Sequence, residues 1–216
     1  FYNNKAAFEC MLAALCLAVT GHNVDRCFMT LGPGGVGQSL MSAWLNALLP
    51  RAHKYLDMNV YFVEEEFRKQ AELLVGCLIT TGQEAVTGSK NTIREDLWKK
   101  HITGDAMPAR LPYGIMTKMV CLEGWKRMEL NSLVHFKGVT EANIDSILRR
   151  CWFCVLRTRF VNAAEGEVLP LGVFRKDPTL KRFLTSGPAV AILCRWIAGF
   201  MVDYNSERCR EIIEHY

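Results

Sequence analysis

The sequence has no apolar run long enough for a membrane-spanning helix. Such a helix needs about 18 or more consecutive apolar residues, and Glu9 interrupts the longest candidate, residues 6–19. Proline is also scarce, with 7 residues in 216, and half of the chain is hydrophobic while 22% is charged. These proportions exclude disordered and collagen-like chains. We therefore expect a globular protein that does not cross a membrane.

The sequence gives little support for secretion. Lys5 followed by the apolar residues 11–19 imitates a signal peptide, but the chain opens with Phe1 and looks like an excised piece. The nine cysteines are an odd number scattered through apolar stretches, unlike the paired framework of a small secreted domain. We expect an intracellular, reducing location, and the nucleus, the cytoplasm and a viral factory fit equally well.

Several motifs of enzyme chemistry are missing. The five histidines form no H-E-x-x-H metal motif, and no serine stands in G-x-S-x-G. Cys151 and Cys154 form a C-x-x-C, but no second pair of cysteines or histidines lies at zinc-ligand spacing, so we interpret them as core residues. Neither metalloprotease nor esterase-type chemistry is favoured.

The net charge of +4 is too small to indicate nucleic-acid binding by itself, but its distribution is uneven. Residues 90–160 hold 13 basic and 7 acidic side chains, whereas residues 1–89 hold 6 and 8, and residues 161–216 hold 7 and 7. The positive excess therefore lies in the middle third, where any contact with an anionic partner is expected.

The order of the segments predicts an α/β fold with a mainly parallel sheet and helices on both faces. An apolar helix over residues 6–19 precedes a β-prone run, residues 27–31, then a glycine loop and a helix over residues 39–49. A surface helix and a second buried β-prone run follow, and from residue 178 the pattern is helical. We divide the chain into an N-terminal helix (1–22), a main domain (23–165) and a helical C-terminal extension (166–216).

The middle of the chain predicts short strands. Residues 115–122 and 125–130 are extended runs joined by Glu123-Gly124, which favours a two-residue hairpin turn. Another strand is expected at residues 133–136. A helix that begins at Thr140 and ends at Arg149-Arg150 precedes a strand at 152–160.

The glycine loop fits the phosphate-binding pattern G-x-x-x-x-G-K-[ST] at every fixed position except the lysine, which is Gln38. Glycines let the backbone turn its N–H groups toward phosphate oxygens, and the following helix N-terminus adds a favourable dipole. An ordinary glycine turn is the alternative. On the phosphate-binding interpretation, the nucleotide contacts are Gly32, Gly34, Gly35, Val36, Gly37, Gln38 and Ser39.

Gln38 puts hydrolysis in doubt more than binding. A lysine would bring a full positive charge to the β and γ phosphates, whereas a glutamine donates neutral hydrogen bonds that are roughly half as strong. Ser39 would offer its hydroxyl to Mg²⁺. Glu84 follows the second buried run and is the candidate acidic residue for the metal or the attacking water, with a solvated loop carboxylate as the alternative.

These motifs together resemble the superfamily 3 helicases, particularly the poxvirus-type and the phage or plasmid primase-helicases. The resemblance runs from about Arg26 to Tyr204. After the glycine loop, residues 74–79 lead to Glu84, and the run K-H-I-T-G-D at 100–105 followed by Ala109-Arg110 is similar to the family's K-x-(I/L)-T-G-G-D and downstream A-R. The pair Arg149-Arg150 before a strand resembles the family's R-R segment.

The resemblance implies an AAA+-like P-loop NTPase fold that binds ATP and Mg²⁺ and acts on DNA during replication as a homo-oligomeric ring. It implies that Arg149 or Arg150 reaches the γ-phosphate of a neighbouring subunit, although two arginines also suit a helix C-terminus. It further implies a DNA-gripping hairpin over residues 115–130. The candidate nucleic-acid contacts are Arg110, Lys118, Trp125, Lys126 and Arg127. The alternative is that the charges are those of an ordinary exposed hairpin and that Trp125 belongs to the core.

The sequence departs from the family pattern in three places. Gln38 replaces the loop lysine, one glycine is missing before Asp105, and the polar sensor expected after residues 133–136 falls near Gly138, flanked by Asn131 and Asn143. A catalytically inactive P-loop subunit that binds nucleotide or DNA is therefore the second hypothesis, and a P-loop kinase or transferase is the third.

Overall fold

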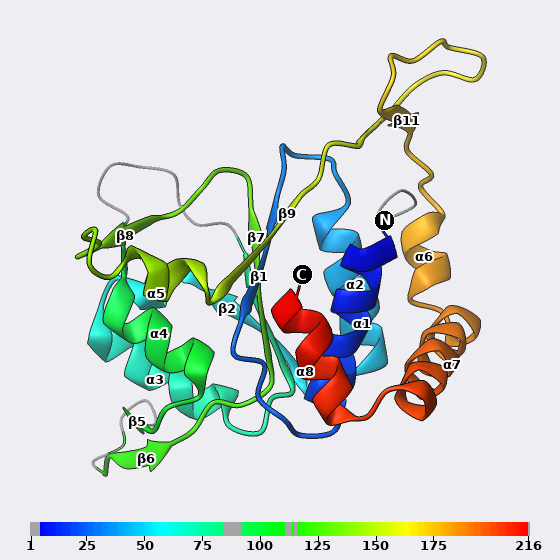
Figure 1. The fold of residues 1–216 in the computed structure, drawn as a ribbon. Helices are drawn as coiled ribbons and strands as arrows, with labels where there is room; N and C mark the ends of the chain where they lie inside the picture. Colours follow the sequence, from blue (N-terminus) through cyan, green and yellow to red (C-terminus); the bar gives the residue numbers. More distant parts are fainter. Residues whose placement is uncertain (1–4, 84–91, 111–113, 115, 216) are drawn as a thin grey trace.

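The computed structural model of the chain describes residues 5–83, 92–110, 114 and 116–215. Its centre is a five-stranded sheet in which every pairing is parallel (Figure 1). In spatial order the strands are β2 (His53–Asp57), β3 (Ile79–Gln83), β7 (Trp125–Leu130), β1 (Cys27–Leu31) and β9 (Cys151–Val155).

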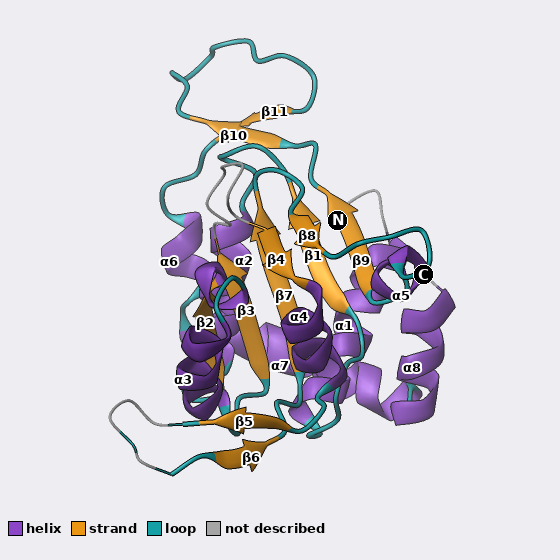
Figure 2. Ribbon diagram, turned by 90° about the vertical axis from the view of Figure 1, so that its left-hand side faces the viewer, coloured by secondary structure: helices purple, strands orange, loops and turns teal. Residues whose placement is uncertain are grey.

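Helices cover both faces of this sheet, as Figures 1 and 2 show. We call one side the α1 face; it carries α1 (Lys5–Val19), α2 (Gln38–Leu48), α6 (Leu180–Leu184), α7 (Gly187–Asp203) and α8 (Ser206–His215). We call the other the α3 face; it carries the 3₁₀ helix η1 (Met58–Tyr61), α3 (Glu64–Leu74), α4 (Glu95–Thr103) and α5 (Ile144–Leu148). The predicted α/β class is confirmed.

Each face has its own apolar core. On the α1 face, the nearly uncharged α1 packs against the sheet and against α7 and α8, and ten of its residues are buried. On the α3 face, aromatic and aliphatic side chains of η1, α3 and α4 form a second cluster. Strands buried on both faces are expected to be apolar throughout, and β1 fits, since its first four residues are buried.

Within the described ranges, three small strand pairs lie outside the central sheet. They are β4 (Thr92–Arg94) with β8 (His135–Lys137), β5 (Met107–Ala109) with β6 (Lys118–Val120), and β10 (Arg159–Val161) with β11 (Val173–Arg175). The β5–β6 pair is antiparallel, and it projects below the body of the molecule in Figure 1. Between β10 and β11 the chain extends well away from the sheet.

The hairpin predicted over residues 115–130 is wrong. β6 pairs with β5 instead, and β7 lies between β3 and β1 in the centre of the sheet. Gly124 has φ +91° and is packed against the backbone of Leu78, so the glycine serves a close approach rather than a hairpin turn. Placing β7 in the sheet buries Trp125, Met128 and Leu130, which a surface hairpin would have exposed.

The strand predicted at residues 133–136 is displaced. The observed strand, β8, pairs with β4 outside the main sheet. The helix predicted from residue 188 is observed as α7, and Pro188 occupies its first turn, where a missing N–H costs no hydrogen bond. Residue 165 lies in the connection between β10 and β11, and the division into three units stays a prediction.

None of the helices in the described ranges is long and apolar enough to cross a membrane.

Candidate nucleotide-binding site

The glycine loop joins the carboxyl end of β1 to the amino end of α2. Leu31 is the last residue of β1 and Gln38 the first residue of α2. Gly35 (φ +88°) and Gly37 (φ +89°) both adopt the left-handed conformation that residues with a Cβ rarely adopt. The strand, tight glycine turn and helix predicted from the sequence are therefore present, in the order that phosphate binding requires.

A second chain segment holds this loop from outside. The Phe160 N–H donates to the carbonyl of Gly35 (2.9 Å), and the Leu156 N–H donates to the carbonyl of Leu31 (2.8 Å). A Cβ at Gly32 would lie 3.0 Å from the Leu156 carbonyl, and one at Gly35 would lie 3.1 Å from that of Phe160. The glycines thus also make room for the segment that follows β9.

The loop presents backbone donors that nothing else in the described structure uses. Among the described residues, we find no hydrogen-bond acceptor for the N–H groups of Gly34, Gly35, Gly37, Gln38 and Ser39. The first amides of any helix lack partners within the helix, and here the preceding loop adds three more. Such a set of unpaired N–H groups at a helix N-terminus is suited to an anion such as phosphate.

Gln38 does not take the place of the missing lysine. Its Nε2 donates to the backbone carbonyls of Thr30 (2.8 Å) and Leu130 (3.1 Å), at the ends of the neighbouring strands β1 and β7. The amide group is therefore bound to the sheet instead of being directed outward. The phosphate-binding capacity of the loop rests on its backbone, without a cationic side chain in this position.

The metal ligands predicted from the sequence are only partly described. Ser39 lies in the first turn of α2 and is exposed, so its hydroxyl is accessible. Glu84 lies outside the described residues, directly after β3. Within the ranges that the structure describes, no group of three or more His, Cys, Asp or Glu side chains forms a metal-binding cluster.

Glu129 is a buried acid beside this site that sequence reasoning missed. It lies on β7, is 6% exposed, and accepts hydrogen bonds from Ser42 Oγ on α2 and from Gln83 Nε2 at the end of β3 (2.8 Å). Arg127, two residues earlier on the same face, lies 3.6 Å from it and donates to Ser42 as well (3.1 Å). This network joins the helix that follows the glycine loop to the strand that precedes Glu84.

Three predicted DNA contacts are corrected by the position of β7. Trp125, Lys126 and Arg127 are each at most 2% exposed, so their side chains cannot reach a phosphate backbone on the surface. Arg127 lies over the Trp125 ring, 5.3 Å from its centroid, on the α1 face. Lys126 is on the α3 face, where it donates to Asn23 Oδ1 and to the carbonyl of Ile102 (3.4 Å).

The other two predicted DNA contacts remain on the surface. Arg110 follows β5 and forms an ion pair with Glu65 (2.5 Å), and Lys118 begins β6 and forms one with Glu72 (2.6 Å). The Lys118 side chain is 60% exposed. The basic residues of the β5–β6 pair are therefore accessible, although each already has an acidic neighbour on α3.

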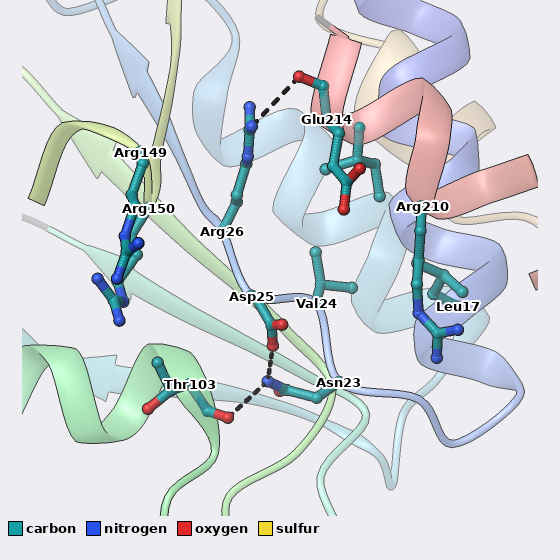
Figure 3. A pocket seen from close by; sticks show the side chains of 11 residues that line it. Leu17, Asn23, Val24, Asp25, Arg26, Thr103, Arg149, Arg150, Arg210 and Glu214 are labelled. Atoms are coloured by element: carbon teal, nitrogen blue, oxygen red, sulfur yellow. Dashed lines mark hydrogen bonds between the residues drawn. The ribbon is translucent and has the colours of Figure 1, made fainter. Parts of the chain in front are cut away.

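Arg149 and Arg150 lie at the opposite edge of the sheet from the glycine loop. They end α5 and directly precede β9, whereas the loop follows the carboxyl end of β1. Five-residue strands separate the two edges by about 15 Å. Neither arginine can therefore reach a phosphate bound in its own loop. Both line a pocket of about 420 Å³, shown in Figure 3.

The strand between β1 and β3 changes the position of the candidate sensor. That strand is β7, and the residue directly after it is Asn131, which is exposed. Asn143 instead donates to the Glu95 carboxylate (2.7 Å) and to the Gly138 carbonyl (2.9 Å), bracing the turn before α5. Asn131 therefore directly follows the carboxyl end of β7, at the edge of the sheet where the glycine loop also lies.

Comparisons by sequence identify no relative. No family model matches the chain, and no curated protein matches it. Solved structures match its fold. The apo A form of the NrS-1 C terminal region superposes with a TM-score of 0.65 at 12% identity, and a further apo structure of that region with 0.65 at 14%. Both matches cover 99% of this chain and 48% of the other, so the chain spans about half the length of those structures.

JCV Helicase, bound to a thiazolopyridine acetamide compound, is a more distant match, with a TM-score of 0.51 at 14% identity over 97% of this chain and 60% of that one. At these identities the likeness shows the fold alone. The chain shares with these structures an α/β fold built on a mainly parallel sheet with helices on both faces, as the order of its elements predicted.

Proposed function

We propose that this chain is a nucleotide-binding helicase-type domain that acts on DNA as a ring-shaped homo-oligomer. The observation that carries the proposal is the set of unpaired backbone N–H groups after the carboxyl end of β1, those of Gly34, Gly35, Gly37, Gln38 and Ser39. Backbone donors and a helix dipole suffice to hold a polyphosphate. The fold shared with JCV Helicase supports the helicase part of the proposal.

The residues present fit ATP and Mg²⁺. The loop amides would hold the phosphates, the exposed Ser39 hydroxyl would be a metal ligand, and Glu84 would be the acidic partner. A bound Mg²⁺ would neutralise negative charge on the β and γ phosphate oxygens. The Glu129 network holds α2 in place about one turn after Ser39, because Ser42 donates to the Glu129 carboxylate.

Arg149 or Arg150 would act on the nucleotide of a neighbouring subunit. Their position at the amino edge excludes action on their own loop, so a role in catalysis requires a second copy. In general, an arginine that stabilises a transferring phosphoryl group contributes a factor of 10³ to 10⁵ in rate. The proposal of a ring follows from this requirement.

The β5–β6 pair is the proposed DNA contact in place of residues 125–127. It projects from the body, carries Arg110 and Lys118, and exposes Met116 and Met119 near its tip. Positive side chains follow a phosphate backbone, and DNA would compete with Glu65 and Glu72 for them. The proposed contact therefore moves from the hairpin predicted over residues 115–130 to the pair that β6 forms with β5.

A second candidate function is a nucleotide-binding assembly subunit that does not hydrolyse ATP. The position of Gln38 favours it, because the side chain that should approach the γ-phosphate is bound to two backbone carbonyls instead. The two candidates share the fold and the phosphate loop, and they differ in turnover alone.

Nucleotide binding is tested with a matched pair of variants at Gly37. Asp and Asn both tolerate the left-handed conformation, and a Cβ at Gly37 has ordinary contact with the Phe160 ring (3.8 Å). Gly37→Asp places a negative charge beside the phosphates, whereas Gly37→Asn does not. Isothermal titration with MgATP should show a binding site in Gly37→Asn that is weakened at least tenfold in Gly37→Asp. Identical isotherms would contradict the proposal.

Turnover distinguishes the two candidate functions. ATP hydrolysis is measured with and without single-stranded DNA for the natural chain and for Gln38→Lys. Hydrolysis by the natural chain, stimulated by DNA, eliminates the inactive subunit. No hydrolysis by the natural chain together with recovery in Gln38→Lys supports the inactive subunit and eliminates the active helicase.

A further inference from the structure

A pocket lined by four arginines lies at the amino edge of the sheet, opposite the glycine loop. Its volume is about 420 Å³, within the range of small-molecule sites. The arginines come from three separate parts of the chain. They are Arg26, just before β1; Arg149 and Arg150, at the end of α5; and Arg210, on α8.

The side chains approach the pocket from different sides, as Figure 3 shows. Arg149 and Arg150 lie next to each other on one wall, and Arg210 lies on the opposite wall beside Leu17. Arg26 extends between them toward α8, where it donates to the Glu214 carbonyl (3.3 Å). Segments far apart in sequence thus bring four cations to one cavity.

The positive charge of the pocket is only partly offset by acidic neighbours. Two carboxylates line it, those of Asp25 and Glu214, so the four arginines leave a formal charge of +2. Within the described part of the chain, no carboxylate oxygen lies within 4 Å of any of the four guanidinium groups. Asp25 instead accepts from Asn23 Nδ2 (2.6 Å).

The walls are held in place by bonds that do not involve a ligand. Asn23 donates to the carbonyls of Ile102 (3.1 Å) and Thr103 (3.0 Å), which fixes the segment before β1 to the end of α4. Arg150 donates to the Ser146 carbonyl (2.6 Å). Burial, followed by the neighbouring Arg149, lowers the pKa of Arg150, and the charges of Asp105, Asp25 and Glu95 oppose that shift without cancelling it. A bound anion would relieve this repulsion between adjacent cations.

We propose that this pocket is a second anion site, which binds the triphosphate group of a small ligand independently of the glycine loop. Guanidinium groups bind phosphate oxygens through two parallel N–H bonds, and four of them match a group with several adjacent anionic oxygens better than a single carboxylate. The ligand is either free inorganic triphosphate or the triphosphate of a nucleotide. Arg26 and Arg210 have no part in the proposed function, so the two proposals can fail separately.

The test uses the full chain in the Gly37→Asp background, where the glycine loop is blocked, and inorganic triphosphate as the probe. Isothermal titration should still show one binding site. Adding Arg26→Gln and Arg210→Gln should weaken that site at least tenfold. The matched control removes two charges from exposed arginines elsewhere, Arg182→Gln and Arg195→Gln on α6 and α7, and should change the affinity less than twofold.

Two results would overturn the proposal: no triphosphate binding in Gly37→Asp, or equal weakening by the two pairs of arginine substitutions. Thermal unfolding of the Arg26→Gln, Arg210→Gln variant shows whether α8 is still packed on α1, and an affinity loss in a chain with unchanged Tm supports the pocket. A parallel titration with ATP identifies the source of the ligand. Tighter binding of ATP than of triphosphate points to a nucleotide, and equal binding points to the phosphates alone.

Discussion

The two faces of β7 bury charge in different ways. On the α1 face, Arg127 is accompanied by the Glu129 carboxylate (3.6 Å), with Ser42 hydrogen-bonded to both. On the α3 face, Lys126 has neutral partners, Asn23 Oδ1 and the Ile102 carbonyl. One strand therefore carries a buried ion pair on one face and, on the other face, a buried lysine whose partners are uncharged oxygen atoms.

The difference appears in the protonation of the two cations. Burial lowers the pKa of Lys126 from 10.5 to about 7, because its neutral partners and the more distant Asp25 offset little of the lost hydration. Burial also lowers the pKa of Arg127, and the Glu129 charge opposes that shift, so the guanidinium stays charged. A buried lysine can lose its charge by deprotonation near pH 7, whereas a buried arginine stays charged and needs an anionic partner.

The largest expected effect comes from breaking the ion pair. Glu129→Leu leaves the Arg127 guanidinium buried without its carboxylate, and we expect a loss of about 3–5 kcal/mol in the free energy of unfolding. Chemical denaturation measures it.

The double variant Arg127→Met, Glu129→Leu is the control, since it removes both charges. It should be more stable than Glu129→Leu alone, because no unpaired charge remains. A double variant that is less stable than the single one would show that the pair contributes through packing and not through charge.

The second largest expected effect is a dependence of stability on pH that comes from Lys126 and not from Arg127. Since the folded pKa of Lys126 is about 7 and the unfolded value about 10.5, the unfolded chain binds more protons between these values. Stability should therefore rise with pH, by about 1.5 kcal/mol between pH 7 and 8.5. Well below pH 7, Lys126 is protonated in both the folded and the unfolded chain, so its contribution to stability no longer changes with pH. Lys126→Met should remove this rise. Urea unfolding at each pH measures it.

Lys118→Met is the matched control for Lys126→Met. It removes the same charge from a side chain that is 60% exposed, and should leave the slope between pH 7 and 8.5 unchanged. If both methionine variants flatten the slope equally, net charge and not burial is responsible.

The smallest expected effect lies beside Arg127. Burial and the neighbouring Arg127 charge lower the pKa of His53 from 6.5 to about 4, and its Nε2 is hydrogen-bonded to Thr81 Oγ1 (2.9 Å). The unfolded chain binds the extra proton between these values, so stability should fall by about 1 kcal/mol from pH 6.5 to 5.5. His53→Gln should make this fall shallower, and the exposed His135→Gln should not.

The structure of the glycine loop could be predicted because it is decided locally. Gly35 and Gly37 need positive φ, and the apolar runs on either side of the loop fix a strand and a helix. Neither requirement depends on residues far away in the sequence. The same holds for Pro188, whose place in the first turn of α7 follows from its own ring.

The position of β7 could not be predicted in this way. Lys126 and Arg127 indicate a surface strand unless their partners are known, and those partners, Asn23 and Ser42, lie 103 and 85 residues away. One signal was available. Arg127 and Glu129 are two residues apart, so a strand places them on the same face with opposite charges, which permits a buried pair.

The segment after β9 connects the glycine loop to a part of the chain that projects from the body of the molecule. Phe160 is bonded to Gly35, and one residue later the chain leaves the body for the projecting residues 162–172 before it returns as β11. This excursion exposes Val168 and Leu171 almost completely. The projecting segment is therefore joined to the glycine loop through one short strand, β10, whose Phe160 N–H donates to the Gly35 carbonyl.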